Sequence, residues 1–336
     1  MRIFKPADIL LPIGDMHRWS VVACDQFTSE PEYWQQVRAI VGDAPSALNM
    51  ILPEAELSTK DPETESVKIN TTMQRYLNTG VFKAYPDSYI YLERTLKNGA
   101  VRRGIVGMFD LEAYEWAEGT HSPIRATEHT VEDRLPPRVK IRRNAPLEMP
   151  HIMIFMDDPD NIVFSSVTKG ERVYDFELMQ DGGSIVGWLV KDNDKLARAA
   201  EKLGEEDVLR RKYATADNAI VFAMGDGNHS LAAAKLHWEE VKKTLPEAER
   251  ESAPARYALA ELVNIHDASI SFEPIHKVIF DTDPVDFFAE AKAFFTENEG
   301  EGRSIDLVTG EGIERFNISG LTIGQLIGRC EDFCKA

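Results

Sequence analysis

FAMGDGNHSLAAAKLHW, residues 222–238, carries a strand signal, a glycine turn and a helix signal in immediate succession. Residues 219–224 are apolar and β-prone, and the apolar residues after the turn recur at helical spacing. Gly225 and Gly227 allow positive φ and a close approach of the backbone to a ligand. Ser230 is expected to cap the helix. The segment therefore predicts a strand that turns directly into a helix.

The main-chain amides at the start of such a helix favour an anion, phosphate above all. Asp226 lies in the middle of the turn and adds negative charge, which suits a ligand of Mg²⁺ or a base beside a bound phosphate. An ordinary tight turn is the alternative, with Asp226 accepting from local amides and His229 donating at the helix start. The residues expected to bind phosphate here are Gly225, Gly227, Asn228, His229 and Ser230.

A second polar cluster, RATEHTVEDR, covers residues 125–134 and has spacing similar to a capping box, so another helix is expected to begin near it. A solvated, well-capped loop is the alternative interpretation. Together with Asp226, the cluster supplies two carboxylates and imidazoles, which is what a phosphoryl-transfer site needs. We expect Glu128, His129 and Asp226 to be catalytic and Arg125 to contact phosphate.

The chain mixes strand and helix patterns and predicts a fold between α/β and α+β, and its 336 residues favour two domains. An N-terminal α/β region is expected over residues 1–120, with a hairpin near 88–108 because Asn98-Gly99 separates two strand-like runs. The change of character at residues 117–123 marks the boundary. Residues 121–336 would form the region that carries both polar motifs.

Further elements follow from local patterns. Helices are expected at 32–41, 65–80, 192–203 and 284–298, and from 322 onwards; strands are expected at 18–24, 150–158, 184–190 and 256–267, the last beside 272–280. Asp25 follows the first of these strands and is expected to line a pocket. The chain stops inside its last helix without a cap, which suggests that sequence is missing after Ala336.

The charge balance argues against nucleic-acid and membrane partners. Lys and Arg number 38 against 56 Asp and Glu, a formal net charge of −18, which repels phosphate backbones and anionic lipid heads. Small anions can still bind locally, because oriented backbone donors act at short range whereas net charge is screened by salt.

The cysteines and the hydropathy pattern point to the cytoplasm. Cys24, Cys330 and Cys334 are too few and too scattered for a disulfide framework, which fits a reducing compartment. No apolar run approaches the roughly 18 residues that a membrane span requires, and residues 1–15 are too often broken by proline and aspartate for a signal peptide.

Five blocks of sequence resemble an uncharacterised bacterial family, domain of unknown function 1015. They occur in the same order along nearly the whole chain, and members of the family usually extend further at the C-terminus. The blocks are VVACDQF, ATEHTVEDRLPPRVKIRRNAPLEMPHIM, VYDFELM, GDGNHSLAAAK and EPIHKVIF.

The Thr-Glu-His segment and the later glycine turn are also similar, more distantly, to the ParB and sulfiredoxin superfamily, which includes free serine kinases. This resemblance implies that Glu128 and Asp226 are the catalytic acids and that Gly227 and His229 lie in a phosphate turn. Asn228 replaces the family's first histidine of that turn. Ser230 replaces its arginine, so phosphate binding requires Arg125 or another cation in compensation.

The sequence therefore predicts a nucleotide-dependent phosphotransferase that acts on a small hydroxyl compound. Glu128 would take the proton of the hydroxyl, and Asp226 would hold Mg²⁺ or act as second acid. The nucleotide would be ATP, ADP or CTP with Mg²⁺. Two alternatives stay open: a non-catalytic nucleotide-binding switch or interaction module, and a metal-dependent hydrolase built from histidines such as His129, His229 and His266.

Overall fold

The computed structural model describes residues 2–117, 119–128, 130, 132, 135–149, 151–214, 220–271, 276–296, 299–310 and 312–335. The fold is mixed α/β, as the sequence predicts. Contacts divide the chain into two compact units, Met1–Ser271 and Phe272–Ala336. The boundary expected at residue 120 falls within the first unit.

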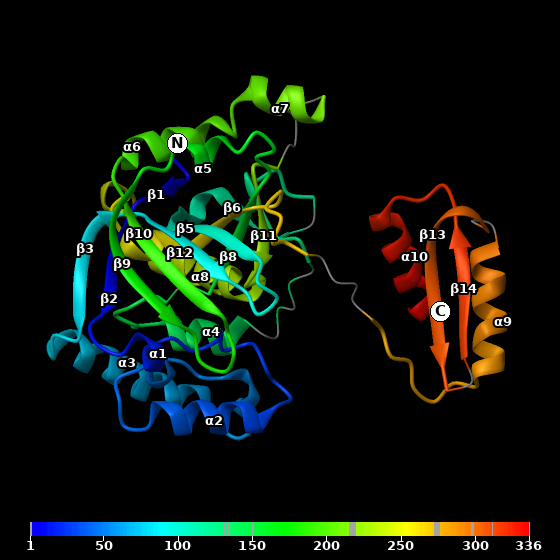
Figure 1. Cartoon of the computed structure of the whole chain (residues 1–336), viewed down its shortest axis with the longest axis horizontal. Helices are drawn as coiled ribbons and strands as arrows, with labels where there is room; N and C mark the ends of the chain where they lie inside the picture. Colours follow the sequence, from blue (N-terminus) through cyan, green and yellow to red (C-terminus); the bar gives the residue numbers. More distant parts are fainter. Residues whose placement is uncertain are drawn as a thin grey trace. The chain divides into compact units, whose positions relative to one another are not determined.

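The first unit is built on one large mixed sheet (Figure 1). Its strands are ordered β6-β7-β11-β8-β12-β5-β4-β10-β9, and β1 pairs with β5. A separate pair, β2 with β3, forms a small antiparallel sheet. The strands are β1 (Phe4–Lys5), β2 (Ala7–Pro12), β3 (Phe82–Ser88), β4 (Ile90–Thr95), β5 (Val101–Asp110), β6 (Tyr114–Glu115), β7 (Ile124–Arg125), β8 (Met153–Met156), β9 (Lys169–Glu177), β10 (Ser184–Val190), β11 (Phe222–Asp226) and β12 (Tyr257–Asn264).

The helices of this unit connect and cover the strands. The α-helices are α1 (Met16–Trp19), α2 (Pro31–Val41), α3 (Pro62–Asn78), α4 (Leu135–Arg142), α5 (Ile162–Ser166), α6 (Asn193–Lys202), α7 (Glu206–Tyr213) and α8 (Asn228–Lys242). Short 3-10 turns are η1 (Ala47–Met50), η2 (Glu54–Glu56), η3 (Leu111–Ala113), η5 (Glu247–Glu249) and η6 (Pro254–Arg256).

Each face of the large sheet has its own core. Met224, Ile154 and Leu262 lie on one face and pack in one cluster with Leu231 and Trp238 of α8. The opposite face packs against the small β2–β3 sheet, with Ile9, Ile90 and Val106 in a second cluster. Burial of apolar side chains on both faces is the main stabilising term for such a sheet.

The hairpin expected near residues 88–108 is confirmed as β4 and β5. Thr95 pairs with Val101, and the Ala100 amide donates to Asn98 Oδ1 over 3.0 Å. Gly99 takes a positive φ of 82°, which the turn requires and which glycine adopts without strain. The helices expected at 32–41, 65–80, 192–203, 284–298 and beyond 322 are also confirmed, within a few residues at each end.

The prediction of a strand at residues 18–24 is wrong. Its first part is α1, and the remainder has no strand pairing. Val21 and Val22 pack instead in the cluster formed by α2, and the Cys24 carbonyl accepts the Glu54 amide over 2.8 Å. A short apolar run can be buried in a sheet or packed against a helix, so the sequence pattern alone does not distinguish these two structures.

The segment 256–267 contains β12, which confirms the predicted strand. The prediction that residues 272–280 lie beside this strand is wrong. β12 pairs antiparallel with β5 and parallel with β8. Residues 276–280 form no strand, and 272–275 lie outside the described residues.

Strand register places four residues in one row across the sheet. Asp226 pairs with Met153, Met153 with Glu261, and Glu261 with Val106. β11 runs antiparallel to β8, so β11 ends beside the residue at which β8 begins. The glycine turn that follows β11 therefore lies at the end of the sheet where β8 begins.

Two glycines leave bare positions on the face that packs against β2. Glu261 reaches across Gly104 to Arg102 Nη2 at 3.0 Å, and the two side chains are 17% and 14% exposed. The ring of Tyr174 lies over Gly187 in the same way. A Cβ atom at either glycine would overlap the neighbouring side chain.

The second unit is a hairpin with two helices. Its elements are α9 (Pro284–Phe295), β13 (Glu299–Thr309), β14 (Gly312–Ile318) and α10 (Ile323–Lys335). Phe295, Ile318 and Leu326 form its core together with the partly buried Ile305 and Phe316. Across the described part of the chain, no helix is both long and apolar enough to cross a membrane.

Gly107→Ala should destabilise the first unit by about 1–3 kcal/mol, because a methyl group would overpack a rigid aromatic site. Its Cβ would lie 2.6 Å from the ring of Phe4 and 2.7 Å from that of Tyr89. Urea unfolding followed by tryptophan fluorescence measures this effect in the first unit alone, because all five tryptophans precede Ser271.

Gly204→Ala is the matched control, since its Cβ would meet Val221 at an ordinary 3.5 Å. It should change the free energy of unfolding by less than about 0.5 kcal/mol. Equal midpoints for the two variants would contradict the packing at Gly107.

Candidate functional site

The strand, turn and helix predicted at residues 222–238 are present as β11, Gly227 and α8. Gly227 is the N-cap residue, with φ 80° and ψ 30°, and its carbonyl accepts the Leu231 amide over 3.0 Å. A Cβ on Gly227 would lie 3.2 Å from Ile152 Cα, so both the backbone angle and the space favour glycine. The prediction that Ser230 caps the helix is wrong, because the N-cap residue is Gly227, which has no side chain to accept an amide.

Asp226 turns back onto the main chain. Its Oδ1 accepts the Gly227 amide over 2.7 Å, as the ordinary-turn alternative expects. The side chain is otherwise exposed at the end of β11. One amide of the turn is therefore already satisfied by the chain itself.

Glu128 meets the start of α8. Asn228, the first residue of α8, is only 4% exposed and donates from Nδ2 to Glu128 Oε1 over 3.0 Å. Its Oδ1 accepts the Thr127 amide over 3.4 Å, and Thr127 Oγ1 donates to the Met224 carbonyl over 2.9 Å. The two motifs, far apart in sequence, are thus joined by a buried amide side chain.

Asp25 is a third acid close to this turn. Although Asp226 reaches solvent, neighbouring protein groups displace part of the water around its carboxylate, and this desolvation together with the negative charge of Asp25 raises the pKa of Asp226. The amide of Gly227 offsets part of this rise. Asp25 Oδ1 is buried and has no hydrogen-bond partner among the described residues. The sequence places Asp25 only at the end of an expected strand and does not indicate its proximity to Asp226.

His151 is a site residue that the sequence analysis missed. Its Nε2 lies 2.5 Å from Ser230 Oγ, in the first turn of α8. Burial lowers the pKa of His151, although the charges of Asp25 and Asp226 oppose this shift. The imidazole is therefore neutral at neutral pH and can accept a proton. His151 lies in a run expected to be strand, where no local pattern indicates a catalytic role.

Arg138, on α4, places a positive charge near the acidic side chains of the site. Burial lowers its pKa, and the charges of Cys24 and Asp25 act in the opposite direction. Its guanidinium also forms an ion pair with Glu54. Burial raises the pKa of the Cys24 thiol to about 11, so this cysteine is protonated at neutral pH.

The remaining predicted residues are placed as follows. Arg125 lies on β7 beside β11, and its Nε donates to the Ser122 carbonyl over 2.7 Å. His229 is the second residue of α8. His129 lies outside the described residues.

His266 does not join this site. It follows the C-terminal end of β12, which lies beside the end of β8 that is farther from Asp226. Its Nε2 contacts Asp157 Oδ1 at 2.6 Å. Within the described ranges, no three acid, cysteine or histidine side chains are arranged to hold a metal ion. The geometry therefore offers no preformed metal centre in that part of the molecule.

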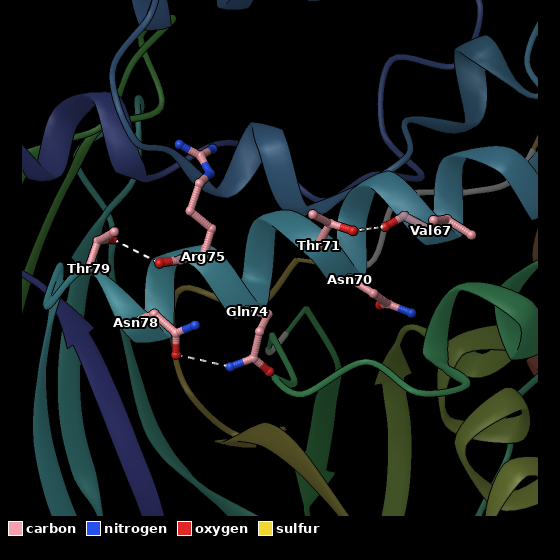
Figure 2. A pocket seen from close by; sticks show the side chains of 7 residues that line it. All are labelled: Val67, Asn70, Thr71, Gln74, Arg75, Asn78 and Thr79. Atoms are coloured by element: carbon pink, nitrogen blue, oxygen red, sulfur yellow. Dashed lines mark hydrogen bonds between the residues drawn. The ribbon is translucent and has the colours of Figure 1, made fainter.

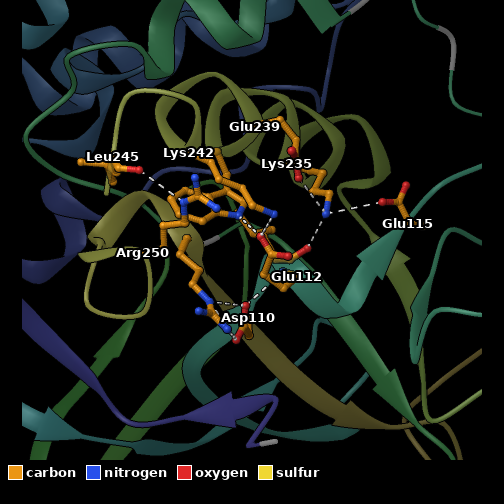
Figure 3. A network of polar contacts seen from close by, with 11 residues as sticks. Asp110, Glu112, Glu115, Lys235, Glu239, Lys242, Leu245 and Arg250 are labelled. Carbon is orange, nitrogen blue, oxygen red and sulfur yellow. Dashed lines mark hydrogen bonds and ion pairs between the residues drawn. The ribbon is translucent and has the colours of Figure 1, made fainter. Parts of the chain in front are cut away.

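The later turns of α8 are fixed by a paired network of charges (Figure 3). Asp110 is fully buried and binds Arg256 through Nε and Nη2. Glu112 accepts from Lys242 over 2.6 Å, and Lys235 donates to a main-chain carbonyl of η3 over 3.0 Å. These charges are matched by partners, so the network positions α8 and leaves chemistry to its N-terminal end.

A depression along the outer face of α3 is a weaker candidate (Figure 2). It is lined by residues from Val67 to Thr79, all on or just after this one helix. Gln74 and Asn78 bond to one another there, at 3.2 Å. No carboxylate or imidazole lines it, so it lacks the groups needed for proton transfer.

The family described as "Protein of unknown function (DUF1015)" matches residues 5–320. The chain belongs to this family. The match includes the complete site around Asp226 and confirms the family that the sequence blocks resemble. Comparisons with curated proteins and with solved structures gave no match.

Asp226→Asn should raise the melting temperature at pH 7. A raised pKa means that the ionised carboxylate opposes folding: the stability is complete below the unfolded-state pKa of about 3.9 and is lost as pH rises through the higher folded-state pKa. Asparagine removes the charge and keeps an acceptor for the Gly227 amide. The gain, measured by calorimetry, should shrink as pH falls towards about 4.

Asp157→Asn is a control of opposite sign. Burial of Asp157 is outweighed by hydrogen bonds from Tyr213 and His266, which lower its pKa to about 2. The ionised form therefore stabilises the fold at neutral pH, and this variant should melt at lower temperature. Destabilisation of Asp226→Asn at pH 7 would contradict the conclusion that the surroundings of Asp226 disfavour its ionised form.

Proposed function

We propose that this protein is a nucleotide-dependent phosphotransferase that acts on a small hydroxyl compound. The observation that carries the proposal is the hydrogen bond to Glu128 from Asn228, which is the first residue of α8 and lies two residues after Asp226. It holds the Glu128 carboxylate at the helix N-terminus, where its charge also acts on Asp226. These are the groups that proton transfer and phosphate binding require.

The turn is suited to phosphate at short range. The first amides of α8 have no intrahelical acceptors, and their dipoles favour negative charge. Gly227 lacks a side chain that would cover them. The acidic surface of the whole protein does not prevent such binding, because its field is screened over about 8 Å in physiological salt.

Glu128 is assigned as the base for the acceptor. The acceptor oxygen forms a new bond to phosphorus, the bond from that phosphorus to the oxygen that carried it breaks, and the hydroxyl proton passes to the Glu128 carboxylate. Asp226 is the second acid. Nucleotides carry Mg²⁺, and the carboxylate oxygens of Asp226 and Asp25 are ligands that this ion accepts.

The resemblance to free serine kinases supports the same assignment of Glu128 and Asp226. It rests on the two motifs alone. Ser230 stands where those kinases have an arginine, and Arg138 supplies a cation on the same side of the site, near Asp25 and His151. All three cysteines are free, which supports action in a reducing compartment such as the cytoplasm.

Asp226→Asn and Glu128→Gln should each lower kcat by about 10²–10⁴-fold, because each removes a carboxylate from the reacting groups. The measurement is phosphoryl transfer from ATP, ADP or CTP with Mg²⁺ to a panel of small hydroxyl compounds. Asp43→Asn changes an exposed acid just after the C-terminal end of α2; it is the matched control and should keep wild-type turnover.

Wild-type turnover in Asp226→Asn would remove the proposal. Thermal stabilisation of the wild type by a nucleotide, with no product from any acceptor, would instead favour the non-catalytic binding module. Stabilisation of about 2.7 kcal/mol is expected when the nucleotide is at a hundred times its Kd.

A further inference from the structure

Ser230 and His151 form a hydroxyl–imidazole pair that the assignment of Glu128 and Asp226 does not use. Ser230 Oγ and His151 Nε2 are 2.5 Å apart. A nucleophilic serine is recognised by a base within hydrogen-bond distance and by groups that hold that base in place. The pair meets the first of these conditions directly.

The charges around His151 supply the electrostatic part of the second condition. The charges of Asp25 and Asp226 act on the imidazole and favour its protonated form, so they stabilise the imidazolium that appears when serine gives up its proton. Burial acts in the opposite direction and keeps the resting imidazole neutral. Asp25 Oδ1, buried and unpartnered in the described part of the chain, leaves one acceptor available near this pair.

The position of Ser230 in α8 also suits a nucleophile. It is the third residue of a helix whose N-cap residue, Gly227, has no side chain. The main-chain dipoles at the start of a helix stabilise negative charge that develops on an attacked centre. The positive charge of Arg138 lies on the side of His151 and, like burial, favours the neutral imidazole that can accept the serine proton.

We propose that Ser230 Oγ is a covalent nucleophile that accepts a phosphoryl group, with His151 as its base. That the group is phosphoryl rests on the proposed function. Ser230 Oγ bonds to phosphorus, the phosphorus–oxygen bond to the nucleotide breaks with its electron pair on the leaving oxygen, and the serine proton moves to His151 Nε2. The acceptor hydroxyl then attacks the phosphoserine, Glu128 takes its proton, and Ser230 Oγ leaves and regains a proton from His151.

A fluorophosphonate probe tests the nucleophile without any nucleotide. Attack by Ser230 displaces fluoride, and the adduct is located by mass spectrometry of peptides. We expect the wild type to be labelled at Ser230, Ser230→Ala to be unlabelled there, and His151→Gln to react at least about a hundredfold more slowly, as loss of a general base predicts. Ser252→Ala, an exposed serine outside the site, is the matched control and should leave the labelling of Ser230 unchanged.

Glu128→Gln separates this inference from the proposed function. It should be labelled by the probe at the wild-type rate, because Glu128 acts only on the acceptor. With ATP, ADP or CTP and Mg²⁺, it should accumulate phosphoserine at Ser230, since the second transfer is blocked. Loss of turnover in Glu128→Gln with no phosphoserine would leave the transfer function standing and overturn the covalent step.

Two results overturn the nucleophile itself: no adduct at Ser230 in the wild type, or an adduct that forms equally fast in His151→Gln. Melting temperatures of both variants within a few degrees of the wild type show that the comparison is made on folded protein. Because Ser230 is only partly buried, Ser230→Cys provides a second variant, which should form a thioether with iodoacetamide faster when His151 is present.

Discussion

The turn at Gly227 is the constraint on which the rest of the site depends. The chain has to leave β11 and begin α8 with only Gly227 between them, at a positive φ and with Ile152 close enough to crowd a Cβ atom. Once this turn is made, the first residues of α8 have fixed positions. Asn228 is delivered to Glu128 and Ser230 to His151. If α8 began at a different residue, the Asn228–Glu128 contact and the Ser230–His151 contact would both be lost.

Features encoded within a few neighbouring residues could be predicted from the sequence. The hairpin at Asn98-Gly99 and the strand–turn–helix at residues 222–238 follow from backbone preferences and periodicity, and both are present. Glu128 and Asp226 could be selected by their chemistry. Their approach to one another, through Asn228, is a tertiary contact that no local pattern determines.

The missed features are those that depend on long-range packing. His151 lies in a run that reads as strand, and only the fold brings it to Ser230. The apolar residues at 18–24 fit a strand or a helix-packing site equally well, and contact with α2 decides between them. The pairing of β12 with β5 and β8 is likewise non-local. The sequence of β12 therefore does not identify its partner strands, and the prediction of residues 272–280 as one of them is wrong.

Gly104 and Gly187 lie on either side of Leu92 in one row of the large sheet, and the side chains of Glu261 and Tyr174 lie over the two glycines from neighbouring strands. At these two positions the floor is backbone, and the space above it is filled by the side chains of Glu261 and Tyr174. Shortening either one would open space without altering a single strand pairing. This face of the sheet can consequently be reshaped in volume while its framework stays rigid.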